Sequence, residues 1–148
     1  MALHIEVLRL QPGDDLRGAL EAAFRAARGS GAEGVDGDRA IGGACVLSAV
    51  GSLSAAVLRY ADQPTGTTLA GPLELLTLSG TLSRDGPHLH ATVADAQGQV
   101  RGGHLMRGCT VRTTAELVLG LLPGWQFSRA PDPATGFMEL VVRRTDVS

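Results

Sequence analysis

The segment Asp95–Gly98, which reads Asp-Ala-Gln-Gly, constrains the fold of this 148-residue chain more than any other feature. Asp at the first position and Gly at the fourth suit a type I turn followed by a left-handed glycine, which is the common three-residue hairpin loop. Taking the last three residues as that loop pairs Asp95 with Gln99. The sequence therefore predicts an antiparallel hairpin made of His88–Asp95 and Gln99–Met106.

This register decides which residues share a face of the hairpin. Counting outward from the loop pairs His90 with His104 and His88 with Met106, and residues opposed on antiparallel strands have Cβ atoms about 5 Å apart. Because side chains alternate along a strand, His88 shares the face of His90. A two-residue loop would move His104 to the other face. The opposite face is apolar and is expected to point to the core: Leu89, Ala91, Val93 and Leu105.

Three imidazoles on one face are the ligand set of an open zinc site, with a fourth position left for water or a ligand. The sequence therefore predicts a metal site at His88, His90 and His104, with zinc as the first expectation. Gly102 and Gly103 are expected to leave room beside it. The alternative is that the three histidines lie on a solvated or subunit-facing sheet surface without a metal.

The clearest helix is predicted over Asp14–Arg28, where Leu16, Leu20 and Phe24 recur on one apolar stripe. The glycine-rich, polar segment Gly29–Gly43 is predicted to be a loop or a weak edge strand. Strands are expected in the segments that are rich in apolar or alternating residues: Leu3–Leu10, Ala44–Tyr60, Leu73–Leu82 and Phe137–Val142.

The segment Thr113–Leu122 is compatible with both a strand and a helix. Alternating Leu117, Leu119 and Leu121 indicate a strand, which the internal Gly120 also favours because glycine weakens a helix. We therefore expect one helix packed on a mostly antiparallel sheet, which is an α+β fold. No repeat or linker divides the chain, so residues 1–148 are expected to form a single domain.

Net charge, hydropathy and cysteine content exclude several classes of protein. The formal net charge is −2 and all 13 basic residues are arginine, so the chain has no general attraction for polyanions. No apolar run approaches the length of a membrane span. Cys45 and Cys109 are isolated thiols without CxxC spacing, which favours a reduced, cytoplasmic protein.

Several ordered blocks together resemble the plants-and-prokaryotes conserved (PPC) domain family, as a prokaryotic single-domain member related to the domain of plant AT-hook proteins. The resemblance spans nearly the whole chain, and the blocks that carry it are Arg9–Leu16, Gly51–Leu53, Leu58–Tyr60, Pro72–Thr81, His88–Ala91, Gly102–Leu105, Gly108-Cys109, Thr113–Glu116 and Asp132–Phe137. It implies a curved, mostly antiparallel sheet, assembly as a homotrimer, and a histidine trio at His88, His90 and His104 that in some members looks able to hold a metal.

The family is described as one of candidate DNA-binding proteins because its plant members carry AT-hooks. This chain lacks the Arg-Gly-Arg-Pro core of an AT-hook. Direct DNA binding needs clustered basic side chains on phosphates, and here only a trimer could gather Arg101, Arg107 and Arg112 into one patch. DNA is therefore a doubtful partner.

These features favour a homotrimeric binding or regulatory module whose histidine face takes a metal and a small ligand. The alternative is a zinc-dependent hydrolase or lyase, which would need a general base beside the metal. Glu74 and Glu116 are the candidates, with Arg59 as the expected ion-pair partner of Glu74 and Cys109 as a further neighbour of the histidine strand. A ligand trio alone does not make a reaction, so a binding role is the primary expectation.

Overall fold

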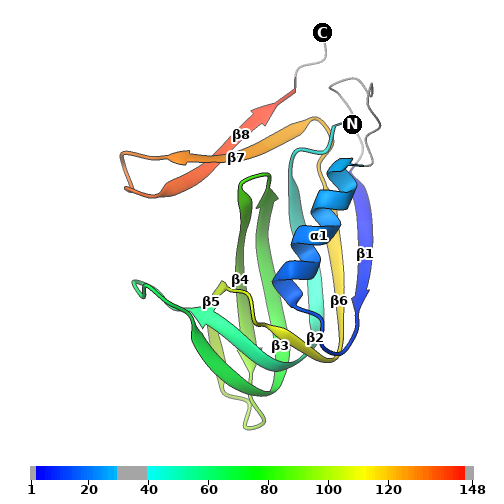
Figure 1. The fold of residues 1–148 in the computed structure, drawn as a ribbon, viewed down its shortest axis with the longest axis vertical. Helices are drawn as coiled ribbons and strands as arrows, with labels where there is room; N and C mark the ends of the chain where they lie inside the picture. The colour runs from blue at the N-terminus through cyan, green and yellow to red at the C-terminus, as the bar shows by residue number, and fades with distance from the viewer. Residues whose placement is uncertain (1–2, 30–39, 146–148) are drawn as a thin grey trace.

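The computed structural model describes residues 3–29 and 40–145, and its main element is a six-stranded antiparallel sheet with the order β1-β6-β2-β3-β4-β5 (Figure 1). A separate two-stranded sheet, β7-β8, lies beside one end of it. The strands are β1 His4–Leu10, β2 Ala44–Arg59, β3 Thr67–Ser83, β4 Gly86–Ala94, β5 Val100–Leu105, β6 Thr110–Leu121, β7 Trp125–Pro131 and β8 Met138–Arg144. The expected α+β class with a mostly antiparallel sheet is confirmed.

The sheet is strongly curved, because β5 returns to pair with the end of β2. Leu105 lies opposite Leu58 and His104 opposite Arg59, so β2, β3, β4 and β5 form a closed ring at this end. Gly103 permits this closure, since a Cβ atom there would lie 2.7 Å from the carbonyl oxygen of Arg59. Gly103 lies opposite the buried Ala91, on the core side of the hairpin, so it does not leave the room that was expected on the histidine face.

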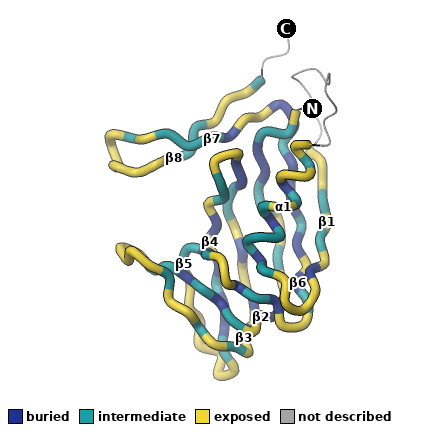
Figure 2. The backbone as a smooth tube through the Cα atoms, in the orientation of Figure 1, coloured by how far each residue is buried: buried dark blue, intermediate teal, exposed yellow. Residues whose placement is uncertain are grey.

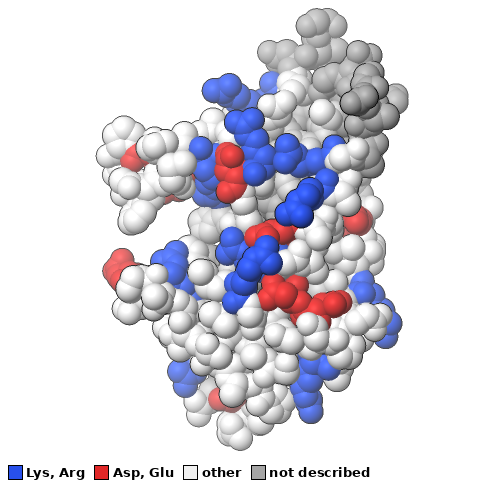
Figure 3. Space-filling model, viewed as in Figure 1, with Lys and Arg blue, Asp and Glu red and all other residues white. Residues whose placement is uncertain are grey.

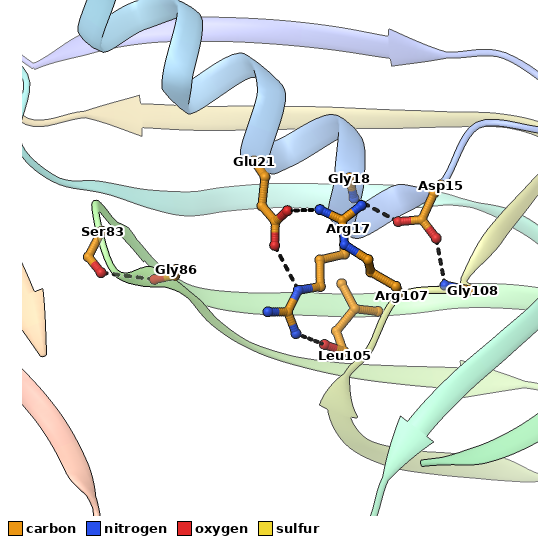
Figure 4. Close-up of polar contacts among 9 residues, drawn as sticks. All are labelled: Asp15, Arg17, Gly18, Glu21, Ser83, Gly86, Leu105, Arg107 and Gly108. Carbon is orange, nitrogen blue, oxygen red and sulfur yellow. Dashed lines mark hydrogen bonds and ion pairs between the residues drawn. The ribbon is translucent and has the colours of Figure 1, made fainter. Parts of the chain in front are cut away.

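Helix α1, Leu16–Gly29, packs on one face of the sheet. Its stripe of Leu16, Leu20 and Phe24 is buried, as the periodicity predicts. Asp15 caps the first turn, because its Oδ1 accepts a hydrogen bond from the Gly18 amide at 2.7 Å. Its Oδ2 accepts another from the Gly108 amide at 2.6 Å, which ties the helix to the segment between β5 and β6 (Figure 4).

Charged side chains reinforce the same junction. Glu21 of α1 accepts hydrogen bonds from Arg17, at 2.9 Å, and from Arg107 (Figure 4). Arg17 also donates to the carbonyl oxygen of Leu105 at 3.2 Å. Arg107 is therefore part of a structural ion-pair network with the helix.

The core lies between α1 and the inner face of the curved sheet, and it is built almost entirely from leucine, valine and alanine. The expected core face of the hairpin, Leu89, Ala91, Val93 and Leu105, is buried. In contrast, the β7–β8 hairpin is exposed or half-buried over nearly its whole length (Figure 2).

Several boundaries differ from the prediction. Strand β3 begins at Thr67, six residues before the expected Leu73, and the last strand begins at Met138. The segment Thr113–Leu122 is a strand up to Leu121, as favoured, and this part belongs to β6. Strand β7 was not predicted, because its polar residues give no alternating pattern. The loop expected over Gly29–Gly43 lies largely outside the described residues.

Within the described residues, no helix is both long and apolar enough to cross a membrane.

Candidate metal centre

The three histidines come together on one face of the β4–β5 hairpin. His90 lies opposite His104, as the turn chemistry predicts. Gly98 has a φ of +77°. The amide of Gly98 donates a hydrogen bond to the carbonyl oxygen of Asp95 at 2.9 Å. The amide of Asp95 donates one to the carbonyl oxygen of Gln99 at 3.1 Å. The predicted loop and register are therefore confirmed.

One ligand nitrogen from each of His88, His90 and His104 lies within 4.8 Å of the other two. Nε2 of His90 lies 3.2 Å from Nδ1 of His104. The ring of His104 stacks on that of His88, with centroids 5.2 Å apart, and stands perpendicular to that of His90. The three rings therefore contact one another, and each brings one nitrogen close to those of the other two.

The position of His88 differs from the prediction in one respect. It is not opposed by Met106, because β5 ends at Leu105 and Met106 donates its amide to the carbonyl oxygen of Val57 on β2, at 3.0 Å. The neighbour of His88 across the sheet is Thr81 of β3. His88 still shares the face of His90, because both lie on β4 two residues apart.

The surroundings favour neutral imidazoles. Desolvation lowers the pKa of His104, and the nearby charges of Arg59, His90 and His88 lower it further. Desolvation also lowers the pKa of His88, helped by Arg129, and Glu139 opposes this effect. Metal ligands must be deprotonated, so a lowered pKa keeps both rings in the ligating form to a lower pH.

Arg129 of β7 and Glu139 of β8 bring the second sheet close enough to act on His88 electrostatically. Arg129 was missed because β7 was not predicted, and Glu139 was missed because nothing in the sequence placed the predicted last strand beside the histidine hairpin. Glu139 also accepts a hydrogen bond from the Thr135 hydroxyl at 3.0 Å. The only signal in the sequence is that these charged residues flank the turn Asp132–Gly136.

Of the predicted supporting residues, Arg59 lies beside the centre and the two glutamates do not. Arg59 is opposite His104 and donates to the carbonyl oxygen of Gln63 at 3.2 Å. Glu74 lies opposite Ser52, seven residues back along β2. The expected ion pair between Arg59 and Glu74 is therefore wrong.

Glu74 and Glu116 are both exposed and line a shallow polar depression with Arg112 on another part of the sheet. Neither is a member of the histidine cluster found among the described residues. The structure therefore brings no predicted general base to the histidines.

Cys109 is fully buried in the core. Its Sγ accepts a hydrogen bond from the amide of Val57 at 3.2 Å and donates to the carbonyl oxygen of the same residue at 3.4 Å. Burial raises the pKa of the Cys109 thiol. A buried, protonated thiol is a packing residue and not a nucleophile.

The donor set fits a first-row transition metal. Zinc–nitrogen bonds of 2.0–2.1 Å in a tetrahedron put the ligand nitrogens about 3.3 Å apart, which the His90–His104 separation of 3.2 Å matches. With all three nitrogens within 4.8 Å of one another, the His88 nitrogen needs to move by no more than about 1.5 Å to reach this separation, which a rotation of its exposed ring can supply. The three histidines can therefore bind a metal.

Comparisons with known proteins place these features in a family. The chain is 51% identical over 142 residues to part of the bifunctional protein GlmU of a Synechococcus strain, covering 96% of this chain and 21% of that protein. The GlmU of a second Synechococcus strain is 49% identical over 143 residues. The chain thus spans about a fifth of the length of the curated relatives it matches.

Solved structures share the fold over nearly their full length. A Salmonella enterica protein is 38% identical with a TM-score of 0.86, covering 97% of this chain and 95% of that one. A metal-containing protein of Archaeoglobus fulgidus is 30% identical with a TM-score of 0.73, covering 93% of each chain. A Ralstonia eutropha protein named as a candidate DNA-binding protein is 24% identical with a TM-score of 0.72, covering 91% and 89%, and shows a common fold.

The family model of the Plants and Prokaryotes Conserved domain matches residues 37–123, which include β2 to β6 and all three histidines of the cluster. With more than half of the chain matched, and the fold shared with a protein that is 38% identical, the chain belongs to the Plants and Prokaryotes Conserved (PCC) domain family.

Proposed function

We propose that this chain is a homotrimeric, metal-binding regulatory module in which His88, His90 and His104 hold one divalent transition metal, with zinc as the first expectation. The observation that carries the proposal is the convergence of three imidazole nitrogens within 4.8 Å on one sheet face. A relative that is 30% identical is itself named a metal-containing protein. A metal on three protein ligands keeps at least one position for water or a small ligand.

The position of the cluster supports a binding role. His88 and His90 are exposed and His104 is half-buried, so a metal there would be reached from solvent. Imidazole ligands suit zinc, copper, nickel and iron, and the metal available to the protein decides among them. Arg59 and Arg129, which act on these histidines electrostatically, would favour an anionic ligand at the open position.

A hydrolase or lyase is the alternative function. A zinc-bound water needs a base to take its proton or to orient it. Glu74 and Glu116, the expected bases, lie in a separate depression. Glu139 is the carboxylate whose charge raises the pKa of His88. The binding role is therefore the function that the site supports best.

Trimer formation is supported by an apolar sheet surface that α1 does not cover. On this surface, which we call the outer face, Ile5 and Val7 of β1 are 53% and 69% exposed, and Leu47 of β2 is 49% exposed. Leu3 and Leu47 approach each other over Gly120 of β6, since a Cβ atom there would lie 3.2 and 3.3 Å from their Cδ1 atoms. A contiguous exposed apolar surface marks an interaction site.

Metal analysis tests the site directly. Wild-type protein, His90→Ala, His104→Ala and the control His4→Ala are purified without chelators, and their metal content is measured by mass spectrometry. His4 is an exposed histidine of β1 outside the cluster. We expect close to one metal per chain in the wild type and the control, and only a trace in the two cluster variants.

Competition with a chromophoric chelator then gives the zinc affinity. Loss of an outer partner of a metal ligand already costs about 10–100-fold in affinity. We therefore expect the loss of a ligand itself to cost more. Equal metal content or equal affinity in all four proteins would overturn the proposed centre.

A further inference from the structure

A second concave site lies away from the histidines, where three arginines converge. The pocket has a volume of about 320 Å³ and opens between the end of α1, the residues that precede β2, the β3–β4 turn and the β7–β8 sheet. Figure 3 shows basic side chains gathered where the end of α1 faces β7–β8. The lining residues are Arg28, Ala40, Ile41, Gly42, Arg84, Gln126, Phe127, Ser128 and Arg143.

The charge of this pocket is one-sided. Arg28, Arg84 and Arg143 line it, and no acidic residue among those described does. The ion pairs within residues 3–29 and 40–145 involve neither Arg28 nor Arg143, and Arg84 approaches only the exposed carboxylate of Asp85, at 3.8 Å. Three guanidinium groups that face a common space repel one another unless an anion lies between them.

The helix does not cancel this charge. The carboxyl end of an α-helix carries about half a negative charge, and Arg28 stands in the last turn of α1. Arg28 also lies over the ring of Phe24, 5.7 Å from its centroid, which holds the guanidinium plane near the helix end. The summed charge of the pocket is therefore clearly positive.

Neutral donors complete the lining. The side-chain amide of Gln126 and the hydroxyl of Ser128 make no hydrogen bond with any other described residue, although both residues line the pocket. Guanidinium, amide and hydroxyl groups are all hydrogen-bond donors. Arginine in particular matches phosphate oxygens with two parallel hydrogen bonds.

The walls of the pocket are joined by backbone contacts. Gly42 donates its amide to the carbonyl oxygen of Trp125 and accepts from the amide of Phe127, both at 3.0 Å. A Cβ atom on Gly42 would lie 2.5 Å from that Trp125 oxygen, so only glycine allows β7 to approach this closely. Next to the pocket, the amide of Arg129 donates to Asp85 Oδ2 at 2.8 Å, which ties the β3–β4 turn that carries Arg84 to β7.

We propose that this pocket binds a phosphate-type oxyanion, either inorganic phosphate or the phosphate group of a small organic molecule, through Arg28, Arg84 and Arg143. The pocket has the size of small-ligand sites, which hold roughly 300–1,000 Å³. None of its lining residues belongs to the histidine cluster, so the site goes beyond the proposed metal function and stands independently of it.

Binding is measured by isothermal titration calorimetry at low ionic strength with inorganic phosphate and, separately, with methyl phosphate. The pocket variants are Arg143→Gln and Arg84→Gln, and Arg143→Lys tests the need for guanidinium geometry. The matched control is Arg101→Gln, an exposed arginine of β5 outside the pocket. Circular dichroism and thermal melting establish that each variant is folded.

Both pocket Gln variants are expected to bind phosphate at least about tenfold more weakly than the wild type, because each loses a charged hydrogen bond. Arg143→Lys should fall between wild type and Arg143→Gln, and Arg101→Gln should bind as the wild type does. Tighter binding of methyl phosphate would identify an organic phosphate as the ligand, and tighter binding of inorganic phosphate would identify the free ion.

A His104→Ala variant separates this proposal from the metal site, since it should keep wild-type phosphate affinity even where metal is lost. Absence of binding by either phosphate compound would overturn the proposal, and so would equal weakening in Arg143→Gln and Arg101→Gln. Binding of a short DNA duplex that phosphate does not displace would also overturn it, because the arginines would then form an open polyanion surface.

Discussion

His90 and His104 face each other across the β4–β5 ladder, with Nε2 of one ring 3.2 Å from Nδ1 of the other. A hydrogen bond at this distance needs a lone pair on one of the two nitrogens, so the contact cannot persist when both rings are protonated. His88 stacks on His104 and would add a third positive charge. Protons and a metal therefore compete for the same three rings.

The first prediction concerns the pH dependence of the metal-free protein. The pKa values of His88 and His104 are lowered from 6.5 in the folded state, so the unfolded chain binds more protons below that pH. Stability is then complete above about pH 6.5 and is lost as the pH falls through the folded pKa values. Urea denaturation of chelator-treated protein from about pH 8 to about pH 5 should show this loss.

In the double variant His88→Asn/His104→Asn, the loss of stability that the two histidines cause at acidic pH should disappear. A wild type and a double variant with parallel stability profiles would show that the two rings keep ordinary pKa values. With zinc bound, the wild-type curve should be displaced to higher stability near neutral pH, because the metal binds the folded state alone.

The second prediction concerns Gly80 of β3, which lies opposite Leu89 of the neighbouring histidine strand β4. Its φ is +133°, and a Cβ atom there would lie 2.0 Å from the carbonyl oxygen of His88. Gly80→Ala should destabilise the protein by about 1–3 kcal/mol through backbone strain alone, and displacement of β4 at His88 should weaken zinc binding as well. Urea denaturation and the chelator competition measure the two effects.

Gly29→Ala is the control for this variant, because a Cβ at the end of α1 meets nothing within 4 Å. It should leave zinc affinity unchanged. Unchanged zinc affinity in Gly80→Ala would contradict the idea that the close approach of β3 to β4 positions His88.

Local chemistry explains which parts of this fold could be predicted. The turn Asp95–Gly98 sets the hairpin register through hydrogen bonds within four residues, so the sequence was sufficient to oppose His90 and His104. Helix α1 was likewise visible in its own periodicity. Closure of β5 onto β2 was not visible, because it joins Leu58 to Leu105 across 47 residues and depends on Gly103 having no side chain.

The same distinction applies to the candidate site. The three histidines lie on one hairpin, where alternation alone predicts their common face. Arg129 and Glu139 reach His88 from another sheet, and β7 is held there by a parallel bridge between Gly42 and Gln126. No period in the sequence encodes such a contact. For the same reason, nothing in the sequence showed that Glu74 lies opposite Ser52, seven residues from Arg59.

The third prediction concerns Asp15, whose carboxylate accepts from the amides of Gly18 and Gly108. Loss of the helix cap in Asp15→Ala should cost about 1–2 kcal/mol, and the unpaired Gly108 amide should add to this cost. Glu116→Ala, which removes an exposed carboxylate of β6, is the control and should be nearly neutral. Chemical denaturation compares the two, and equal free energies of unfolding would contradict the capping role.

The fourth prediction concerns the outer face. Val7 is 69% exposed at the centre of β1, and in the proposed trimer it would be buried against a neighbouring copy. Val7→Glu would place a carboxylate in that contact, where burying an unpaired charge is strongly unfavourable. The wild type should have three times the 15.3 kDa mass of the chain in light scattering, and Val7→Glu should have the monomer mass.

Val100→Glu is the matched control, because Val100 is 57% exposed at the start of β5, beside the Asp95–Gly98 turn and at the opposite end of the strand order from β1. It should remain a trimer. Since Val7 is exposed within one chain, Val7→Glu should keep the circular dichroism spectrum of the wild type even as its mass falls. A wild type with the mass of one chain would contradict the trimer, and a trimeric Val7→Glu would place the subunit contact on a different surface from β1.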